Sequence, residues 1–336
     1  MRRKRLIVGV LAAASVWWLR HGDRPASPVY ERPRLQAAVL SNGFAALVRP
    51  RDVHDSRRVI EVDRDGKSKW LDKVPRVPGD VRLVGTRAGV MLGWKEDHRL
   101  KLATLDVDGV PDQVSRWGKN VETLCDGAAS NEHRFAVGWL DTDNRVSFVS
   151  GPLGGAIDSM TPAAVSGKVT WCGIASAARN VAVFQRDADR LTMMFCGAKT
   201  CSNFITVPIG ADDKILGYGC IADSCLVAAR DRHLDTIKLH HVSSTGREIV
   251  KTLDNATLGT LASIVGVGMH AFAVAYMTQD GHALVRRFTV DSAMTDQWGD
   301  SRADEAPTIA WAADKLFIVA QSNYGSERTF AIDMPR

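Results

Sequence analysis

Apolar and polar residues alternate along most of this chain, in short runs that are separated by turn-forming residues. The segment 135–155 is the clearest case, because FAVGW alternates, LDTDN is polar, RVSFVS alternates again and a Gly/Pro turn follows. Alternation with a period of two residues, bounded by such turns, predicts antiparallel β-strands that are joined by hairpins.

The same unit recurs at nearly constant spacing. Its first strand reads FAALV, VMLGW, FAVGW, VAVFQ, CLVAA, FAVAY and FIVAQ, and these strands begin at Phe44, Val90, Phe135, Val181, Cys225, Phe272 and Phe317. The intervals are therefore 44 to 47 residues, and further apolar runs complete about four strands in each unit. This is the size of one β-propeller blade, and such a sheet must stack on neighbours to bury both faces.

The sequence therefore predicts an all-β fold, a seven-bladed β-propeller of four-stranded antiparallel blades over residues 35–336. Seven units at near-equal spacing disfavour the alternatives, which are a β-sandwich or two separate domains. We name the strands of a blade A (innermost) to D (outermost), so the repeated strand is strand B. The last unit reaches Arg336 after strand C. We expect the proline-containing segment 28–33, within a linker at 21–34, to supply the closing strand, because proline suits an edge strand.

The first 20 residues differ from the repeats. A cationic head, MRRKR, precedes an apolar run of 14 residues that begins at Leu6 and ends at Leu19. This length fits an export signal and is shorter than the ~20 residues of a spanning helix. No good cleavage site follows the run, and Trp17 and Trp18 are typical of a membrane interface. Residues 1–20 are therefore either a signal peptide or an uncleaved signal anchor. The protein is expected to be exported, as a periplasmic or inner-membrane-anchored protein, or secreted after cleavage.

Charge narrows the choice of partners. The formal net charge is +5, but residues 1–24 hold six of the 43 basic residues and one of the 38 acidic ones. The remaining residues therefore contain 37 of each kind. The predicted ring is neutral, so its charge does not favour nucleic acid as a partner.

Six cysteines are consistent with an oxidising compartment. The candidate disulfides are Cys196–Cys201 across a C–D turn, Cys220–Cys225 across an A–B turn, and Cys125–Cys172 on the inner strands of neighbouring blades. The third pair is the least constrained by spacing, and buried reduced thiols are the alternative for all six. The spacings do not match zinc ligands, and we expect neither a metal nor a cofactor.

Two further patterns have a structural and a functional interpretation. Asp-x-Asp-Gly segments begin at Asp63 and Asp106, but they lack the remaining ligands of a calcium loop, so hairpin turns are predicted. Aromatic residues end strand B in three blades, at Trp94, Trp139 and Tyr276. Packing between blades is the favoured interpretation, and a shelf for stacking a glycan is the alternative.

The turn between strands B and C carries an acid followed by an Arg or a His in most units, and in the fifth unit the two lie in a longer loop. The pairs are Asp55/Arg57, Asp97/Arg99, Asp143/Arg145, Asp189/Arg190, Asp231/His233, Asp280/His282 and Glu327/Arg328. All B–C turns of a propeller emerge on one face, which we call the B–C face. A ring of charges there could bind a carboxylate-bearing or polyhydroxylated ligand, and solvated hairpin tips are the alternative. The binding candidates are Arg57, Arg99, Arg145, Arg190, His282 and Arg328.

The pattern of apolar strand, x-Trp, Asp turn, apolar strand and Asp-x-x-Gly resembles the secreted propeller repeats of bacterial envelope proteins, over about residues 35–336. The segment 63–70, DRDGKSKW, also resembles the Asp-box of sialidase-like propellers out of register, without its Ser and Thr. The first resemblance implies an exported binding or scaffold module whose partner is an envelope protein or a glycan. No catalytic residue can be assigned, so a non-enzymatic role is favoured, with a carbohydrate-active hydrolase or lyase as the alternative.

Overall fold

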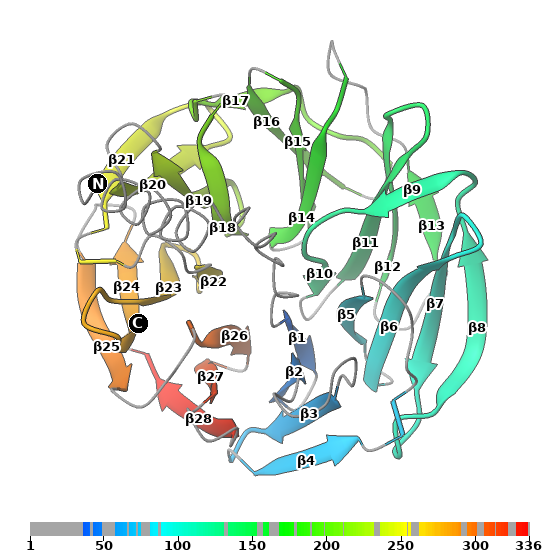
Figure 1. The fold of residues 1–336 in the computed structure, drawn as a ribbon, viewed down its shortest axis with the longest axis horizontal. Coiled ribbons are helices and arrows are strands. Elements are labelled where there is room, and N and C mark those ends of the chain that lie inside the picture. The colour runs from blue at the N-terminus through cyan, green and yellow to red at the C-terminus, as the bar shows by residue number, and fades with distance from the viewer. Residues whose placement is uncertain are drawn as a thin grey trace, which may run out of the picture. The chain divides into compact units, whose positions relative to one another are not determined.

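Every element of secondary structure in the described part of the chain is a β-strand. The computed structural model describes residues 36–40, 43–48, 58–65, 67–71, 73–74, 81–86, 89–130, 134–152, 157–160, 168–177, 180–188, 190–197, 199–210, 212–231, 236–253, 255–256, 262–289, 294–300, 306–312, 314–321 and 327–334. These residues form 28 strands (Figure 1). The predicted all-β class is therefore confirmed.

The first four blades follow the predicted repeats. Blade 1 consists of β1 (Gln36–Leu40), β2 (Gly43–Val48), β3 (Arg58–Asp63) and β4 (Ser68–Leu71). Blade 2 consists of β5 (Val81–Thr86), β6 (Gly89–Glu96), β7 (Arg99–Leu105) and β8 (Pro111–Trp117). Blade 3 contains β9 (Val121–Leu124), β10 (Ala129–Ser130), β11 (Arg134–Asp141), β12 (Val146–Pro152) and β13 (Asp158–Met160). Blade 4 consists of β14 (Trp171–Ala177), β15 (Asn180–Arg186), β16 (Leu191–Cys196) and β17 (Ile205–Val207).

The last three blades repeat the same order. Blade 5 consists of β18 (Lys214–Cys220), β19 (Ser224–Asp231), β20 (Thr236–Ser243) and β21 (Glu248–Thr252). Blade 6 consists of β22 (Ser263–Val267), β23 (Ala271–Met277), β24 (Ala283–Thr289) and β25 (Met294–Asp300). In blade 7 the described strands are β26 (Thr308–Ala312), β27 (Lys315–Gln321) and β28 (Glu327–Asp333). The predicted closing segment 28–33 lies outside the described residues, as do the segments 1–20 and 21–34.

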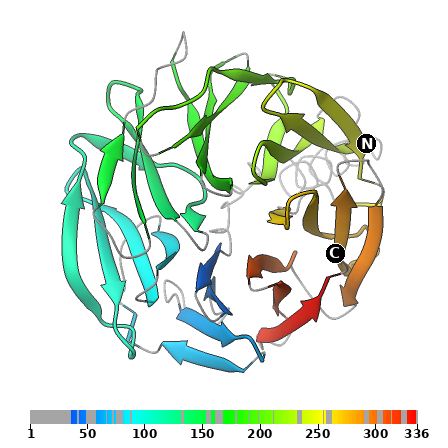
Figure 2. The same ribbon diagram turned by 180° about the vertical axis from the view of Figure 1, so that it is seen from behind.

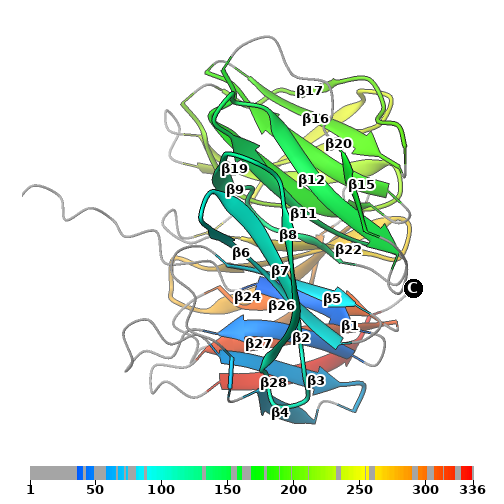
Figure 3. The ribbon, with the colours of Figure 1, turned by 90° about the vertical axis from the view of Figure 1, so that its right-hand side faces the viewer.

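The seven sheets stand around a common axis like the blades of a propeller (Figures 1 and 2). Strands that pair within a blade are antiparallel, and in six of the seven sheets they pair in the order of the sequence. Figure 3 shows the same ring from the side. The seven-bladed propeller predicted from the repeat is therefore confirmed.

The hydrophobic core is divided among the interfaces between blades. One cluster joins blades 1 and 2, and others follow around the ring to the cluster that joins blade 7 to blade 1. In this last cluster the ring centroids of Phe44 and Phe317 are 5.0 Å apart. Both residues begin the strand-B repeat, so the same sequence feature that predicts the blades also packs the first blade against the last.

The aromatic residues at the end of strand B belong to this core. Trp94, Trp139 and Tyr276 are only 5%, 4% and 1% exposed. They lie at the interfaces between blades 1 and 2, blades 2 and 3, and blades 5 and 6, respectively. The packing interpretation is confirmed for these three side chains, because rings buried to this degree present no face on which a glycan could stack.

The Asp-x-Asp-Gly segments form turns, as predicted. Asp63 Oδ1 accepts hydrogen bonds from the main-chain N–H groups of Asp65 and Lys67, at 3.0 and 2.9 Å. Asp106 Oδ1 does the same for Val110 and Asp108, at 2.8 and 2.9 Å, and these hydrogen bonds lower the pKa of the Asp106 carboxyl. The first aspartate of each segment therefore stabilises a C–D turn.

All three candidate disulfides are present, and they involve all six cysteines: Cys125–Cys172, Cys196–Cys201 and Cys220–Cys225. The last two close turns within a blade, whereas the first joins two blades. Within the described ranges, no helix has the length and apolar character needed to cross a membrane.

Candidate binding site at the inner strands of blades 2 to 5

The inner strand of blade 3 is interrupted. Strand β9 pairs with the end of β11 and β10 pairs with its beginning. Between them, the N–H of Cys125 still donates to Gly138 O of β11 at 2.9 Å, and the segment leaves the ladder at Asp126. The sequence predicted Cys125 on the inner strand of its blade, and in the structure Cys125 directly follows β9. The interruption contains Gly127, whose φ of +68° is readily adopted only by glycine.

The interrupted segment pairs instead with blade 4. The main-chain N–H of Asp126 donates to Cys172 O at 2.8 Å, and the N–H of Ile174 donates to Asp126 O at 2.9 Å. These bonds form a parallel bridge between Asp126 and Gly173. The adjacent disulfide Cys125–Cys172 reinforces the bridge, so blades 3 and 4 are joined by main-chain hydrogen bonds and a covalent bond at the same place.

Arg82 of β5 reaches this segment from blade 2. Its side chain is buried, and Nε donates to Cys125 O at 2.5 Å while Nη2 donates to Leu124 O at 3.3 Å. Nη2 also lies 3.6 Å from Asp126 Oδ1. Because a buried guanidinium is costly unless its N–H groups are paired, these contacts explain how an arginine is accommodated on an inner strand.

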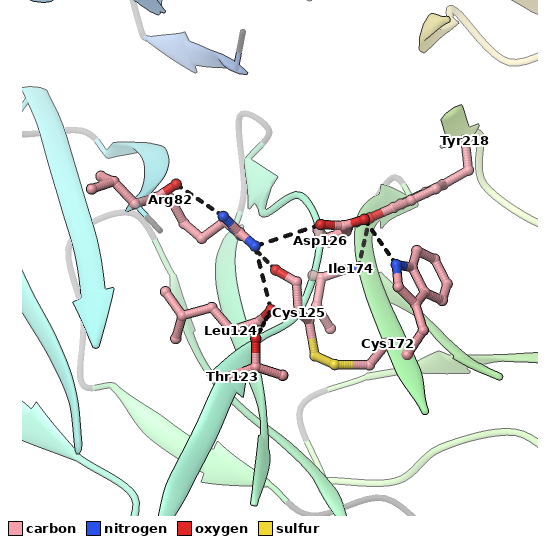
Figure 4. Close-up of polar contacts among 10 residues, drawn as sticks. Arg82, Thr123, Leu124, Cys125, Asp126, Cys172, Ile174 and Tyr218 are labelled. Carbon is pink, nitrogen blue, oxygen red and sulfur yellow. Dashed lines mark hydrogen bonds and ion pairs between the residues drawn. A yellow bond between two sulfur atoms is a disulfide. The ribbon is translucent and has the colours of Figure 1, made fainter. Parts of the chain in front are cut away.

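Two aromatic residues contact Asp126. Figure 4 shows one of them, Tyr218, on the side of Asp126 opposite to Arg82. Trp171 Nε1 of β14 donates to Asp126 Oδ2 at 2.8 Å, and the hydroxyl of Tyr218 from β18 donates to the main-chain oxygen of Asp126. The two rings are 5.8 Å apart at an interplanar angle of 85°. The Asp126 side chain remains 30% exposed. We call the group Arg82, Asp126, Trp171 and Tyr218 the Asp126 site.

Arg82 and Trp171 lie near the B–C end of their inner strands, whereas Tyr218 is the fifth of the seven residues of β18 and lies nearer the A–B end. Trp171 is the first residue of β14 and pairs with Arg186, the last residue of β15, which leads into a B–C turn. Arg82 likewise occupies the second position of β5. Side chains from four consecutive blades therefore meet on the inner strands, and two of them, Arg82 and Trp171, lie towards the face where the sequence predicted a ring of charged turns.

The charged turns themselves form local pairs. Arg145 contacts Asp143 at 2.7 Å and Asp141 at 3.3 Å, and Asp141 Oδ1 also accepts the N–H groups of Asp143 and Arg145. Arg190 Nε donates to Asp187 Oδ2 at 3.1 Å. Asp141 and Asp187 are nearly buried carboxylates at the end of strand B, and neither was predicted for this role from the sequence.

The other candidates differ from one another. Arg99 is exposed and follows a turn in which Asp97 and His98 have positive φ. The Oδ2 atom of Asp97 lies 4.0 Å from Nζ of Lys101. The N–H of His282 donates to Thr278 Oγ1 at 3.0 Å. Arg328 forms an ion pair with Asp300 of the outer strand of blade 6, and so connects two blades. Arg57, Asp55, Asp189 and His233 lie outside the described residues.

No member of the Asp126 site was predicted from the sequence as a functional residue. The available signal was an arginine or an aromatic side chain on an otherwise apolar inner strand, as in DVRLVG, VTWCG and KILGYGC. That signal is weak, because strand patterns do not show which residues of different blades meet at the axis. Among the described residues, no cluster of three or more His, Cys, Asp or Glu side chains could hold a metal ion.

This fold defines the chain as a seven-bladed β-propeller. In comparisons with known proteins, other proteins share this fold, but none is similar enough in sequence to show a family. No protein-family model matches the sequence. No curated protein matches it either.

Solved structures share the architecture. A puromycin hydrolase S511A mutant complexed with PGG matches with a TM-score of 0.59 and 14% identity, over 90% of this chain and 52% of that chain. The WD40 β-propeller domain of Doa1 matches with a TM-score of 0.54 and 11% identity, over 88% of this chain and 90% of that chain. A chain of the mitotic checkpoint complex matches with a TM-score of 0.52 and 13% identity, over 89% of each chain. The present chain spans about half the length of the hydrolase, and identities this low show the fold alone.

Proposed function

We propose that this protein is an exported, non-enzymatic binding or scaffold β-propeller of the bacterial cell envelope, which mediates protein–protein or glycan interactions through its B–C face. The observation that carries the proposal is the Asp126 site. Side chains of blades 2 and 4 approach the partly exposed Asp126 carboxylate, and the Tyr218 hydroxyl of blade 5 donates to the main-chain oxygen of the same residue. Such an arrangement is held rigidly before a ligand arrives, which lowers the entropy cost of binding.

The contacts of Asp126 favour binding over catalysis. Its carboxylate accepts a hydrogen bond from an indole N–H and lies 3.6 Å from a guanidinium, and neither group is among the side chains that usually act as general acids or bases. The hydroxyl of Tyr218 donates to a main-chain oxygen. A hydrolase or lyase needs an acid and a base, or a nucleophile and an acid, directed at one substrate. The geometry around Asp126 therefore supports recognition of a ligand rather than its conversion.

The proposed location rests on two independent features. Three disulfides suit an oxidising compartment such as the periplasm. The basic head and the apolar run that ends at Leu19 suit an export signal or an inner-membrane anchor.

Capture of partners from bacterial envelopes tests the proposal. The full chain, anchored in membranes, is cross-linked and recovered in parallel with Asp126→Asn and with the control Asp108→Asn. Asp108 is exposed in a C–D turn of the opposite face and pairs with Lys73. We expect a discrete envelope component that is recovered with the unaltered chain and the control, and lost with Asp126→Asn. Equal recovery by all three folded proteins, or turnover of an envelope glycan, would overturn the proposal.

The charged turns are tested separately by replacing Arg99, Arg145, Arg190 and Arg328 with alanine together. If these arginines bind the ligand, each lost contact weakens binding by about 1.5–3 kcal/mol, the scale of a charged hydrogen bond. If recovery is unchanged in the folded quadruple variant, the turns are solvated hairpin tips and binding depends on the Asp126 site alone.

A further inference from the structure

We infer that the ligand of the Asp126 site is a neutral, polyhydroxylated molecule, and specifically an uncharged carbohydrate. The inference rests on the proposed binding function and narrows it from any envelope partner to one chemical class. Three properties of the site lead to it: the guanidinium beside the carboxylate, the aromatic surfaces and the rigidity of the segment that carries Asp126.

The Asp126 carboxylate lies beside a guanidinium of the same protein, since Arg82 Nη2 lies 3.6 Å from Asp126 Oδ1. An anionic ligand would approach the Asp126 carboxylate against a like charge. A cationic ligand would compete with Arg82, whose guanidinium is held by the main-chain oxygens of Leu124 and Cys125. A neutral ligand avoids both costs.

Hydroxyl groups are the neutral donors that suit this carboxylate. With 30% of its side chain exposed, Asp126 is accessible to solvent although Trp171 Nε1 already donates to Oδ2. A carboxylate accepts hydrogen bonds at several lone-pair positions on its two oxygens, so it can receive hydroxyl groups in addition to the indole. Hydrogen bonds to a charged acceptor are stronger than those between neutral groups.

The aromatic rings supply the apolar contact. Trp171 and Tyr218 are both partly exposed, and their rings stand nearly perpendicular to each other. A pyranose has an apolar C–H face and polar hydroxyl edges, so it can pack on an aromatic ring while its hydroxyl groups reach a neighbouring carboxylate. Trp94, Trp139 and Tyr276, which the sequence suggested as an alternative shelf, are buried and cannot serve this purpose.

The site is also held in one geometry. Main-chain hydrogen bonds join Asp126 to Cys172 and Ile174, and the neighbouring disulfide fixes Cys125. Gly173 is required for this arrangement, because a Cβ there would lie 2.8 Å from the Tyr218 hydroxyl oxygen and 2.6 Å from Trp171 Cη2. A preformed site compensates for the small contact area that a sugar offers.

The test compares neutral and charged forms of the same sugars with the unaltered full chain. The probes are the methyl glycosides of glucose, galactose, mannose and N-acetylglucosamine, together with methyl glucuronide as the anionic form and glucosamine as the cationic form. Saturation-transfer NMR detects binding, and calorimetry measures Kd. We expect at least one neutral glycoside to bind, and its charged counterparts to bind at least tenfold more weakly. If no neutral glycoside binds, or if charged forms bind equally well, the inference is wrong.

Variants then locate the binding. Asp126→Asn and Trp171→Phe should each weaken binding of the neutral sugar at least tenfold, whereas the controls Asp108→Asn and Trp117→Phe should not change it. Unchanged binding in a folded Asp126→Asn protein would overturn the assignment. If Asp126→Asn does not fold, Trp171→Phe and the comparison of neutral with charged sugars still decide the question.

Failure of the carbohydrate inference can be distinguished from failure of the proposed binding function. An envelope protein that is captured through Asp126, with no sugar bound by the unaltered chain, would retain the binding role and reject the carbohydrate. Failure of both capture and sugar binding would reject both.

Discussion

The hydroxyl of Tyr218 in blade 5 donates a hydrogen bond to the main-chain oxygen of Asp126 in blade 3, although the two residues are 92 positions apart and blade 4 lies between them. The contact passes over Gly173 of β14, which has no side chain to block it. A residue of one blade therefore reaches past its neighbour at the axis of the ring (Figure 4).

Replacing Gly173 with alanine should displace Tyr218 or Trp171. The added Cβ would lie 2.8 Å from the Tyr218 hydroxyl oxygen and 2.6 Å from Trp171 Cη2, which is closer than real contacts allow. We expect a loss of about 1–3 kcal/mol in the free energy of unfolding, the usual cost of overpacking. Gly197→Ala is the matched control, because its nearest atoms would be 3.6 Å away. Urea denaturation measures both variants, and equal stability would show that the ring can adjust at this point.

The disulfide between blades should stabilise the protein more than a disulfide within a turn. Cys125 and Cys172 are separated by 47 positions, whereas Cys196 and Cys201 are separated by five. On the loop-entropy model, loss of the first bond costs about 4 kcal/mol and loss of the second about 2 kcal/mol. Paired serine substitutions, compared by thermal unfolding under non-reducing conditions, should therefore lower the Tm more for the Cys125 pair. The reverse order would argue against this ranking.

Stability should decrease in mild acid because of His241. This residue is 4% exposed, its ring packs against Phe272 at 5.6 Å, and burial lowers the pKa of its imidazole. Asp223 opposes that shift and Arg247 adds to it. Because the unfolded chain binds the proton more readily, the contribution of His241 is complete above the ordinary pKa of about 6.5 and is lost as the pH falls from there through the lowered pKa.

The loss amounts to at most about 1.4 kcal/mol per pH unit for a single group. His241→Leu should remove this part of the pH dependence, whereas His98→Gln, at an exposed turn, should retain it. Chemical denaturation between pH 5 and 8 gives the comparison. If the stability of both variants depends on pH as that of the unaltered chain does, groups other than His241 cause the loss of stability in acid.

Closure of the ring by the segment 28–33 stays a prediction. Blade 7 has three strands among the described residues, β26, β27 and β28. Deleting residues 28–34 should lower the Tm markedly, because it would leave the edge of β28 unpaired and weaken the joint with blade 1. Deleting residues 21–27 is a control of equal length in the same predicted linker. Equal melting temperatures for the two deletions would rule the closing strand out.

The repeat was readable from the sequence because it depends on local pattern. Strand B begins with an apolar residue every 44 to 47 positions, and each of these strands appears in the structure, as β2, β6, β11, β15, β19, β23 and β27. Alternation and turn residues act over a few positions, so no knowledge of distant contacts is needed. The two disulfides within turns follow for the same reason, since their partners are five positions apart.

The Asp126 site was decided by the tertiary structure. Its contacts join Asp126 to residues 44 to 92 positions away. These contacts depend on the break between β9 and β10, which the alternating pattern does not predict. Closing the ring brings the inner strands of successive blades together at the axis, where a main-chain bridge replaces part of the expected ladder. A periodic sequence specifies similar blades, whereas the residues that differ from the period acquire their neighbours only when the blades are assembled around the axis.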